Sequence, residues 1–138
     1  MNEDFVPFEL AKKLNEKGFN EKCMAHYYCA LGLFEYNIKD ISFRKKLLAT
    51  DFMHSYNESK KGNKYIDAPT ISQVLKWLRE DKRIDSGAVW DNRDGKWVGY
   101  INEMDMPDLV GEYVLPDTHD AYEAATIACI EYVLDNLI

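Results

Sequence analysis

The amino-acid sequence predicts an α+β fold in which a small antiparallel sheet packs against two or three helices and a long helix closes the chain. Three observations carry this prediction. Apolar residues at helical spacing follow a T-x-x-Q pattern that starts at Thr70, an Asn-Arg-Asp-Gly run at 92–95 indicates a β-hairpin, and residues 120–137 have the spacing of a long helix. The strands of a hairpin run antiparallel, which sets the expected sheet type.

Two helices are predicted before the hairpin. Residues 7–17 begin with a proline, which suits a first helical turn, and Gly18 is a natural stop. Residues 70–82 form the clearest helix, because Thr70 and Gln73 make a capping box and apolar residues recur three and four positions apart.

The third predicted helix, 120–137, follows Pro116 and is expected to use Asp117 or Thr118 as its cap. Acidic residues near its start suit the positive end of the helix dipole. Its buried face is expected to contain Tyr122, Ala125, Cys129, Ile130, Val133 and Leu134.

One or two strands are predicted over 24–34, with a turn near Gly32, and a further short strand is predicted at 112–115. Residues 41–56 fit either a helix or two pieces separated by a break, and residues 57–63 are expected to form a polar loop.

The hairpin is predicted over 88–101. In the favoured register Asn92 starts a type I turn and Gly95 takes the left-handed position of a bulge. A two-residue turn is the alternative, but it would place Arg93 opposite Lys96, and like charges in that position destabilise a strand pair.

The bulged register sorts the aromatic residues of the hairpin onto two faces. Trp90, Val98 and Tyr100 are expected on one face, and Trp97 and Ile101 on the other. One face can enter the core, and the other leaves a tryptophan near water, where this residue type is enriched at binding hot spots. Trp90, Trp97 and Tyr100 are therefore the candidate interaction surface.

Length and charge limit the classes of function. The 138 residues match one domain, 1–138, and the net charge of −7 opposes binding to nucleic acid or to an anionic membrane. The basic clusters at 44–46 and 60–64 are expected to be solvated. No signal peptide and no apolar run near the ~18 residues of a membrane span is present, so a cytoplasmic protein is expected.

Cysteine and histidine do not predict a metal site or a disulfide. Cys23, Cys29 and Cys129 make an odd count without C-x-x-C spacing, which is typical of reduced, buried thiols. Cys23, His26 and Cys29 have short spacing, but in a strand the histidine would point away from both cysteines, and a fourth zinc ligand is missing. We expect no cofactor.

Local sequence patterns of catalysis are also missing. The chain contains no phosphate-binding glycine loop and no serine at a nucleophile elbow. A site assembled from distant residues stays open, namely a metal-assisted hydrolase that uses His119 with the acidic residues Glu103, Asp105, Asp108, Asp117 and Asp120.

Three stretches together resemble a group of small uncharacterised proteins from gut anaerobic bacteria and their prophages or mobile elements. They are Phe5-Val-Pro-Phe-Glu-Leu-Ala with residues 18–23, residues 68–80, and Tyr122-Glu-Ala-Ala with residues 131–134. The resemblance implies an intracellular, phage-associated protein and transfers no catalytic residue.

These observations favour a non-enzymatic protein-interaction module that binds a protein partner or a second copy of itself. The alternatives are the small metal-assisted hydrolase and an acidic inhibitor or nucleic-acid mimic. A mimic requires negative charge gathered on one face, and the even scatter of lysine and arginine along the sequence disfavours it.

Overall fold

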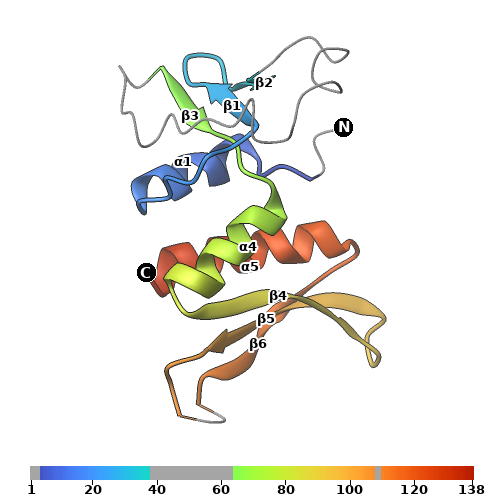
Figure 1. The fold of residues 1–138 in the computed structure, drawn as a ribbon. Helices are drawn as coiled ribbons and strands as arrows, with labels where there is room; N and C mark the ends of the chain where they lie inside the picture. The colour runs from blue at the N-terminus through green and yellow to red at the C-terminus, as the bar shows by residue number, and fades with distance from the viewer. Residues whose placement is uncertain (1–3, 38–63, 108–109) are drawn as a thin grey trace, which may run out of the picture. The chain divides into compact units, whose positions relative to one another are not determined.

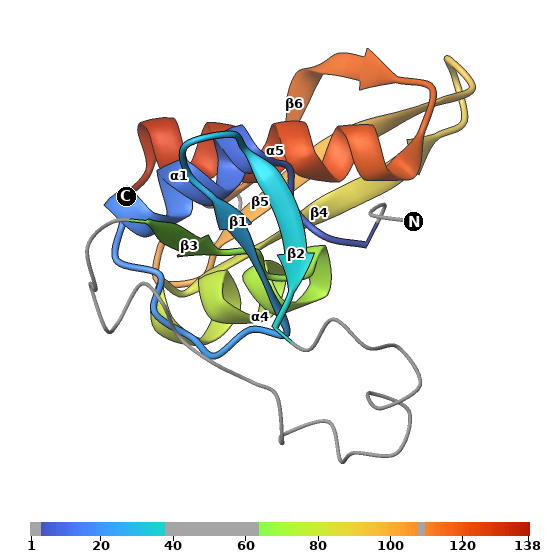
Figure 2. The ribbon, with the colours of Figure 1, turned by 90° about the horizontal axis from the view of Figure 1, so that it is seen from above.

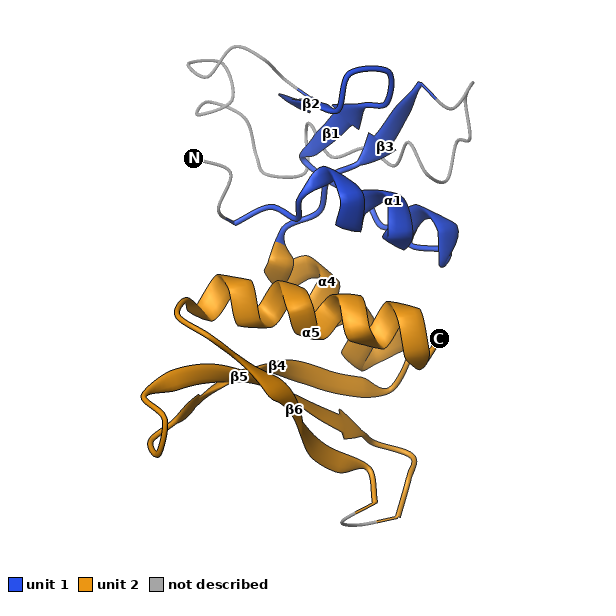
Figure 3. Ribbon diagram, turned by 180° about the vertical axis from the view of Figure 1, so that it is seen from behind, with its two compact units in different colours: residues 1–70 blue, residues 71–138 orange. Residues whose placement is uncertain are grey.

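The computed structural model describes residues 4–37, 64–107 and 110–138, which contain three helices and two antiparallel sheets of three strands each. The predicted α+β class is confirmed. The chain divides into two units, residues 1–70 and residues 71–138 (Figure 3). That residues 1–138 form one domain stays a prediction. If they do, both units should unfold together in a single transition.

The first unit combines helix α1 (Phe8–Glu16) with a sheet in the order β2-β1-β3. Its strands are β1 (Ala25–Tyr28), β2 (Leu33–Tyr36) and β3 (Tyr65–Asp67), and β1 is the central strand (Figure 2). The predicted helix is confirmed, and where one or two strands are predicted over 24–34 the structure has two, β1 and β2, of which β2 continues to Tyr36.

Glycine ends the first helix and shapes the first turn, as the sequence predicts. Gly18 and Gly32 both have positive φ, +89° and +66°, a conformation that L side chains rarely adopt. Val6 connects to the sheet because its carbonyl accepts a 2.6 Å hydrogen bond from the Tyr27 hydroxyl.

The second unit places two helices on one side of a three-stranded sheet (Figure 1). Helix α4 (Ile71–Asp81) packs on β4 (Ile84–Asp91), while α5 (Tyr122–Asn136) crosses β4, β5 (Lys96–Glu103) and β6 (Glu112–His119). The buried side chains of this unit include Val74, Leu78, Ile84, Ile101, Cys129, Ile130, Val133 and Leu134. Of the residues predicted on the buried face of the last helix, Tyr122 is exposed instead.

The hairpin exists where predicted, but its register is different. Residues 92–95 form the loop, which the Gly95 N–H closes with a 2.9 Å hydrogen bond to the Asp91 carbonyl. Gly95 has the predicted left-handed conformation, with φ of +64°. Asp91 therefore lies opposite Lys96, and Trp90 lies opposite Trp97. The predicted separation of the two tryptophans onto different faces is wrong, because the even loop length puts them on the same face.

The start of the last helix also differs from the prediction. Asp117 and Thr118 belong to β6, where Thr118 pairs with Val98, so neither residue caps the helix. Ala121 is at the N-cap position and makes no side-chain capping bond. The local sequence is typical of a helix start, but pairing of β6 with β5 provides hydrogen-bond partners for the backbone here.

Some predictions concern residues outside the described part of the chain. They are the ambiguous segment 41–56, the loop 57–63 and the basic clusters, of which only Lys64 is described. Among the described helices, none has the length and apolar character needed to cross a membrane.

Candidate functional site

Three aromatic side chains gather where the hairpin meets the last helix. The ring centroids of Trp90 and Trp97 are 5.3 Å apart, and those of Trp97 and Tyr122 are 5.2 Å apart, both in edge-to-face geometry. Trp90 is 49% exposed and Tyr122 is 41% exposed. We call Trp90, Trp97 and Tyr122 the aromatic cluster.

Each residue of the aromatic cluster belongs to a different helix or strand. Trp90 and Trp97 are a directly opposed pair in β4 and β5, and Tyr122 is the first residue of α5. An ion pair between Lys96 and Asp120 joins the start of β5 to the connection that leads into α5. The edge-to-face contacts add stability to such a group beyond the area that its members bury.

Tyr100, the third residue of the predicted surface, lies on the other face of the sheet. Its ring covers Gly87, where an added Cβ would be 3.1 Å from Cε1 of the tyrosine. Burial, with a smaller contribution from the Asp85 carboxylate, raises the pKa of Tyr100. Val89 and Val114 are exposed on the same face. The structure thus brings together two of the three predicted surface residues and adds Tyr122.

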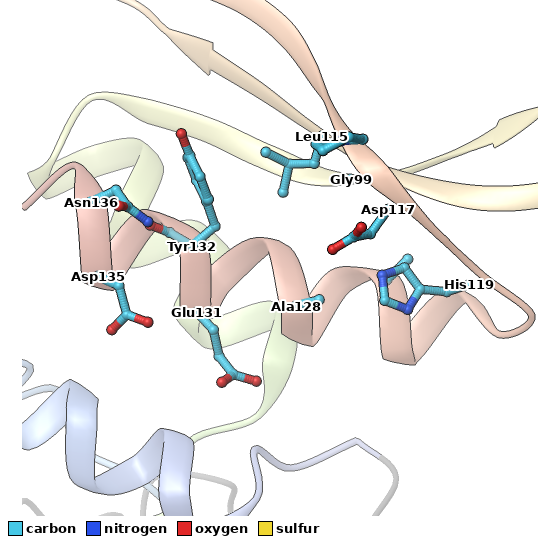
Figure 4. A pocket seen from close by; sticks show the side chains of 11 residues that line it. Gly99, Leu115, Asp117, His119, Ala128, Glu131, Tyr132, Asp135 and Asn136 are labelled. Atoms are coloured by element: carbon cyan, nitrogen blue, oxygen red, sulfur yellow. The ribbon is translucent and has the colours of Figure 1, made fainter.

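A groove runs between α5 and β6, with a volume of about 440 Å³ (Figure 4). Asp117 and His119 line it from the strand, and Glu131, Tyr132 and Asp135 line it from the helix. We call it the α5–β6 groove. It begins beside the aromatic cluster, because His119 pairs with Trp97 in the sheet.

The acidic residues proposed for a metal-assisted hydrolase are dispersed. Asp105 forms an ion pair with Arg83 at 3.4 Å, and Asp120 is paired with Lys96. Of the described residues proposed for the hydrolase, only Asp117 and His119 line the α5–β6 groove. Asp108 lies outside the described residues, and within the described part no group of three or more histidine, cysteine or carboxylate side chains could hold a metal ion.

Glu103 instead accepts a 3.3 Å hydrogen bond from the Tyr113 hydroxyl. Burial and the neighbouring carboxylate together raise the pKa of Tyr113 to about 12. Folding therefore favours the neutral phenol of Tyr113. The stability that this protonated phenol contributes to the folded state is fully present below the ordinary tyrosine pKa of about 10 and is lost as the pH rises through about 12.

We expect Tyr113→Phe to remove one tyrosine from those that ionise near pH 12 in an ultraviolet titration. Glu103→Gln should keep that tyrosine but move its ionisation to lower pH, because the repelling carboxylate is gone. An unchanged titration amplitude in Tyr113→Phe would show that the perturbed tyrosine is a different one.

In the first unit, several polar side chains gather around His26. The His26 side chain is 7% exposed, and its Nδ1 lies 2.8 Å from Oδ1 of Asn37 and its Nε2 3.5 Å from Oε1 of Glu35. Its ring also packs edge-to-face on Tyr65. We call this arrangement the His26 network. Asn37 also donates a 2.7 Å hydrogen bond to the Cys23 carbonyl.

All three cysteines are free thiols. Cys23 and Cys129 are buried as predicted, and Cys29 is half-buried. Burial raises the pKa of the Cys129 thiol, which donates a hydrogen bond to the Tyr100 carbonyl. A buried thiol with a raised pKa forms little of the reactive thiolate.

Comparison with known proteins adds no relative: no protein-family model, no curated protein and no solved structure matches the chain.

Proposed function

We propose that the protein is a non-enzymatic protein-interaction module whose contact surface is centred on the aromatic cluster. The observation that carries the proposal is the half-exposed Trp90, which packs edge-to-face on Trp97, and Trp97 in turn packs edge-to-face on Tyr122. Tryptophan and tyrosine supply large contact area at a small cost in side-chain entropy, and they dominate the energetics of many protein interfaces.

The surroundings support a protein partner in particular. Charges of both signs adjoin the cluster along the chain: Asp91 follows Trp90, and Lys96, which is paired with Asp120, precedes Trp97. A hydrophobic centre within a polar rim is the usual anatomy of a protein interface. The chain's net charge of −7 favours encounter with basic partners.

We expect Trp90→Ala to weaken binding of the physiological partner roughly 30-fold, the effect of removing a hot spot worth about 2 kcal/mol. The partner is first isolated by co-purification from the native host, and affinity is then measured with the two purified proteins. Self-association is measured in parallel by sedimentation velocity, because the partner proposed here includes a second copy of the chain.

Met106→Ala is the matched control. Met106 is 47% exposed, close to the value for Trp90, but it lies in the β5–β6 connection and outside the aromatic cluster. The control should leave affinity within about two-fold of the wild type. Equal effects of the two substitutions, with the fold intact by circular dichroism, would remove the support for this surface.

A further inference from the structure

The α5–β6 groove has an apolar floor made by small residues. Gly99 of β5 and Ala125 and Ala128 of α5 contribute little side-chain volume, and Leu115 of β6 lies against them. A Cβ at Gly99 would be 3.0 Å from Cβ of Cys129, so the glycine lets the helix approach the sheet closely. The result is a groove of about 440 Å³, which is large enough for one or two side chains of a partner.

The rim of the groove is acidic. Asp117, Glu131 and Asp135 belong to its lining. Asp117 is exposed at the strand side, and His119 stands beside it (Figure 4). Tyr132 adds an aromatic ring that is 37% exposed. Carboxylates beside an apolar floor complement a partner that has positive charge next to an apolar side chain.

We propose that the α5–β6 groove binds a short basic segment of a protein, with an apolar side chain on the floor and lysine or arginine beside the Asp117 rim. The inference rests on the proposed function, since it assigns a chemistry to the partner. It uses different residues from the aromatic cluster, so the two claims can fail separately. Asp117 and the groove floor are the features that select this partner.

The test uses a defined probe and the 138-residue chain. The probe is a fluorescein-labelled peptide of alternating lysine and leucine, and the comparison peptide has glutamate in place of each lysine. Fluorescence anisotropy measures the affinity of both peptides. The lysine peptide should bind, with an affinity that falls as salt is added, and the glutamate peptide should not bind.

Two variants separate the groove from general attraction to an acidic protein. Asp117→Asn should weaken binding of the lysine peptide about five-fold, whereas Asp94→Asn, with the same change in net charge at the exposed hairpin loop, should leave it unchanged. Ala128→Leu keeps the charge and fills the floor, so it should weaken binding about ten-fold.

The position of the peptide provides the second readout. In amide NMR spectra the lysine peptide should perturb residues 115–119 and 125–136. Trp90→Ala should leave these perturbations unchanged. No binding of the lysine peptide, equal effects of Asp117→Asn and Asp94→Asn, or perturbations centred outside the groove would each overturn the inference. If Trp90→Ala does not change the affinity for the physiological partner while the lysine peptide still binds, the proposed contact surface at the aromatic cluster is overturned instead.

Discussion

Replacing Gly99 with valine is expected to lower the free energy of unfolding of the second unit by about 3 kcal/mol, the upper part of the range for overpacking. The Cβ of any larger residue would be 3.0 Å from Cβ of Cys129 and 3.1 Å from Cδ1 of Leu115. The first of these atoms is fixed to the α5 backbone, so the helix has to move away from the sheet. Branching at Cβ places two more methyl groups in the same space.

Tryptophan fluorescence during denaturant unfolding measures this effect selectively. All three tryptophans, Trp77, Trp90 and Trp97, lie in the second unit. Gly87→Val is the matched control, because an added Cβ there meets the edge of the Tyr100 ring, which can rotate. A loss of stability at Gly87 equal to that at Gly99 would contradict the close packing of α5 on β5.

His26→Ala is expected to lower the stability of the first unit by about 2–3 kcal/mol, since it removes a buried ring and the hydrogen bond that this ring makes with Asn37. Asn37 donates its amide N–H to the Cys23 carbonyl, which turns Oδ1 toward the histidine. Nδ1 of His26 is therefore the donor in the 2.8 Å bond.

Hydrogen exchange of single amides measures the effect on the first unit. The Ala68 N–H, which bonds to the Ala25 carbonyl between β3 and β1, should exchange faster in His26→Ala. His119→Ala is the control, because that histidine is half-exposed and lies in the second unit. Unchanged protection at Ala68 in the His26 variant would show that the network contributes little to stability.

Local signals in the sequence predicted most of the regular structure. Proline and glycine bracket α1, and glycines with positive φ mark the turns at residues 32 and 95. Such signals act over a few residues, so their meaning depends little on the rest of the chain. They were sufficient for the α+β class and for the existence of the hairpin.

The errors arose where distant residues decide the local structure. Pro116, Asp117 and Thr118 have the composition of a turn and a helix cap, but pairing with β5 keeps them in a strand with a register shift opposite Gly99. The hairpin loop has one more residue than the bulged turn requires, and this single residue reverses the faces of one strand.

The candidate site was only partly predictable for the same reason. The spacing of Trp90 and Trp97 identified them as residues of interest, while Tyr122 joins them only because β6 returns the chain to the hairpin. The α5–β6 groove depends on Gly99 and Ala128, which lie far apart in the sequence and carry no chemical signal of their own.

The most direct test of the proposed function is site-specific photo-crosslinking in the native host. A photoreactive phenylalanine derivative is placed at Trp90 in one variant and at Met106 in another, two positions with almost equal exposure. The proposal predicts a discrete protein adduct from position 90 that is absent from position 106 and is lost when Trp97→Ala is added. The same adducts from both positions, or none from position 90, would contradict an interaction surface at the aromatic cluster.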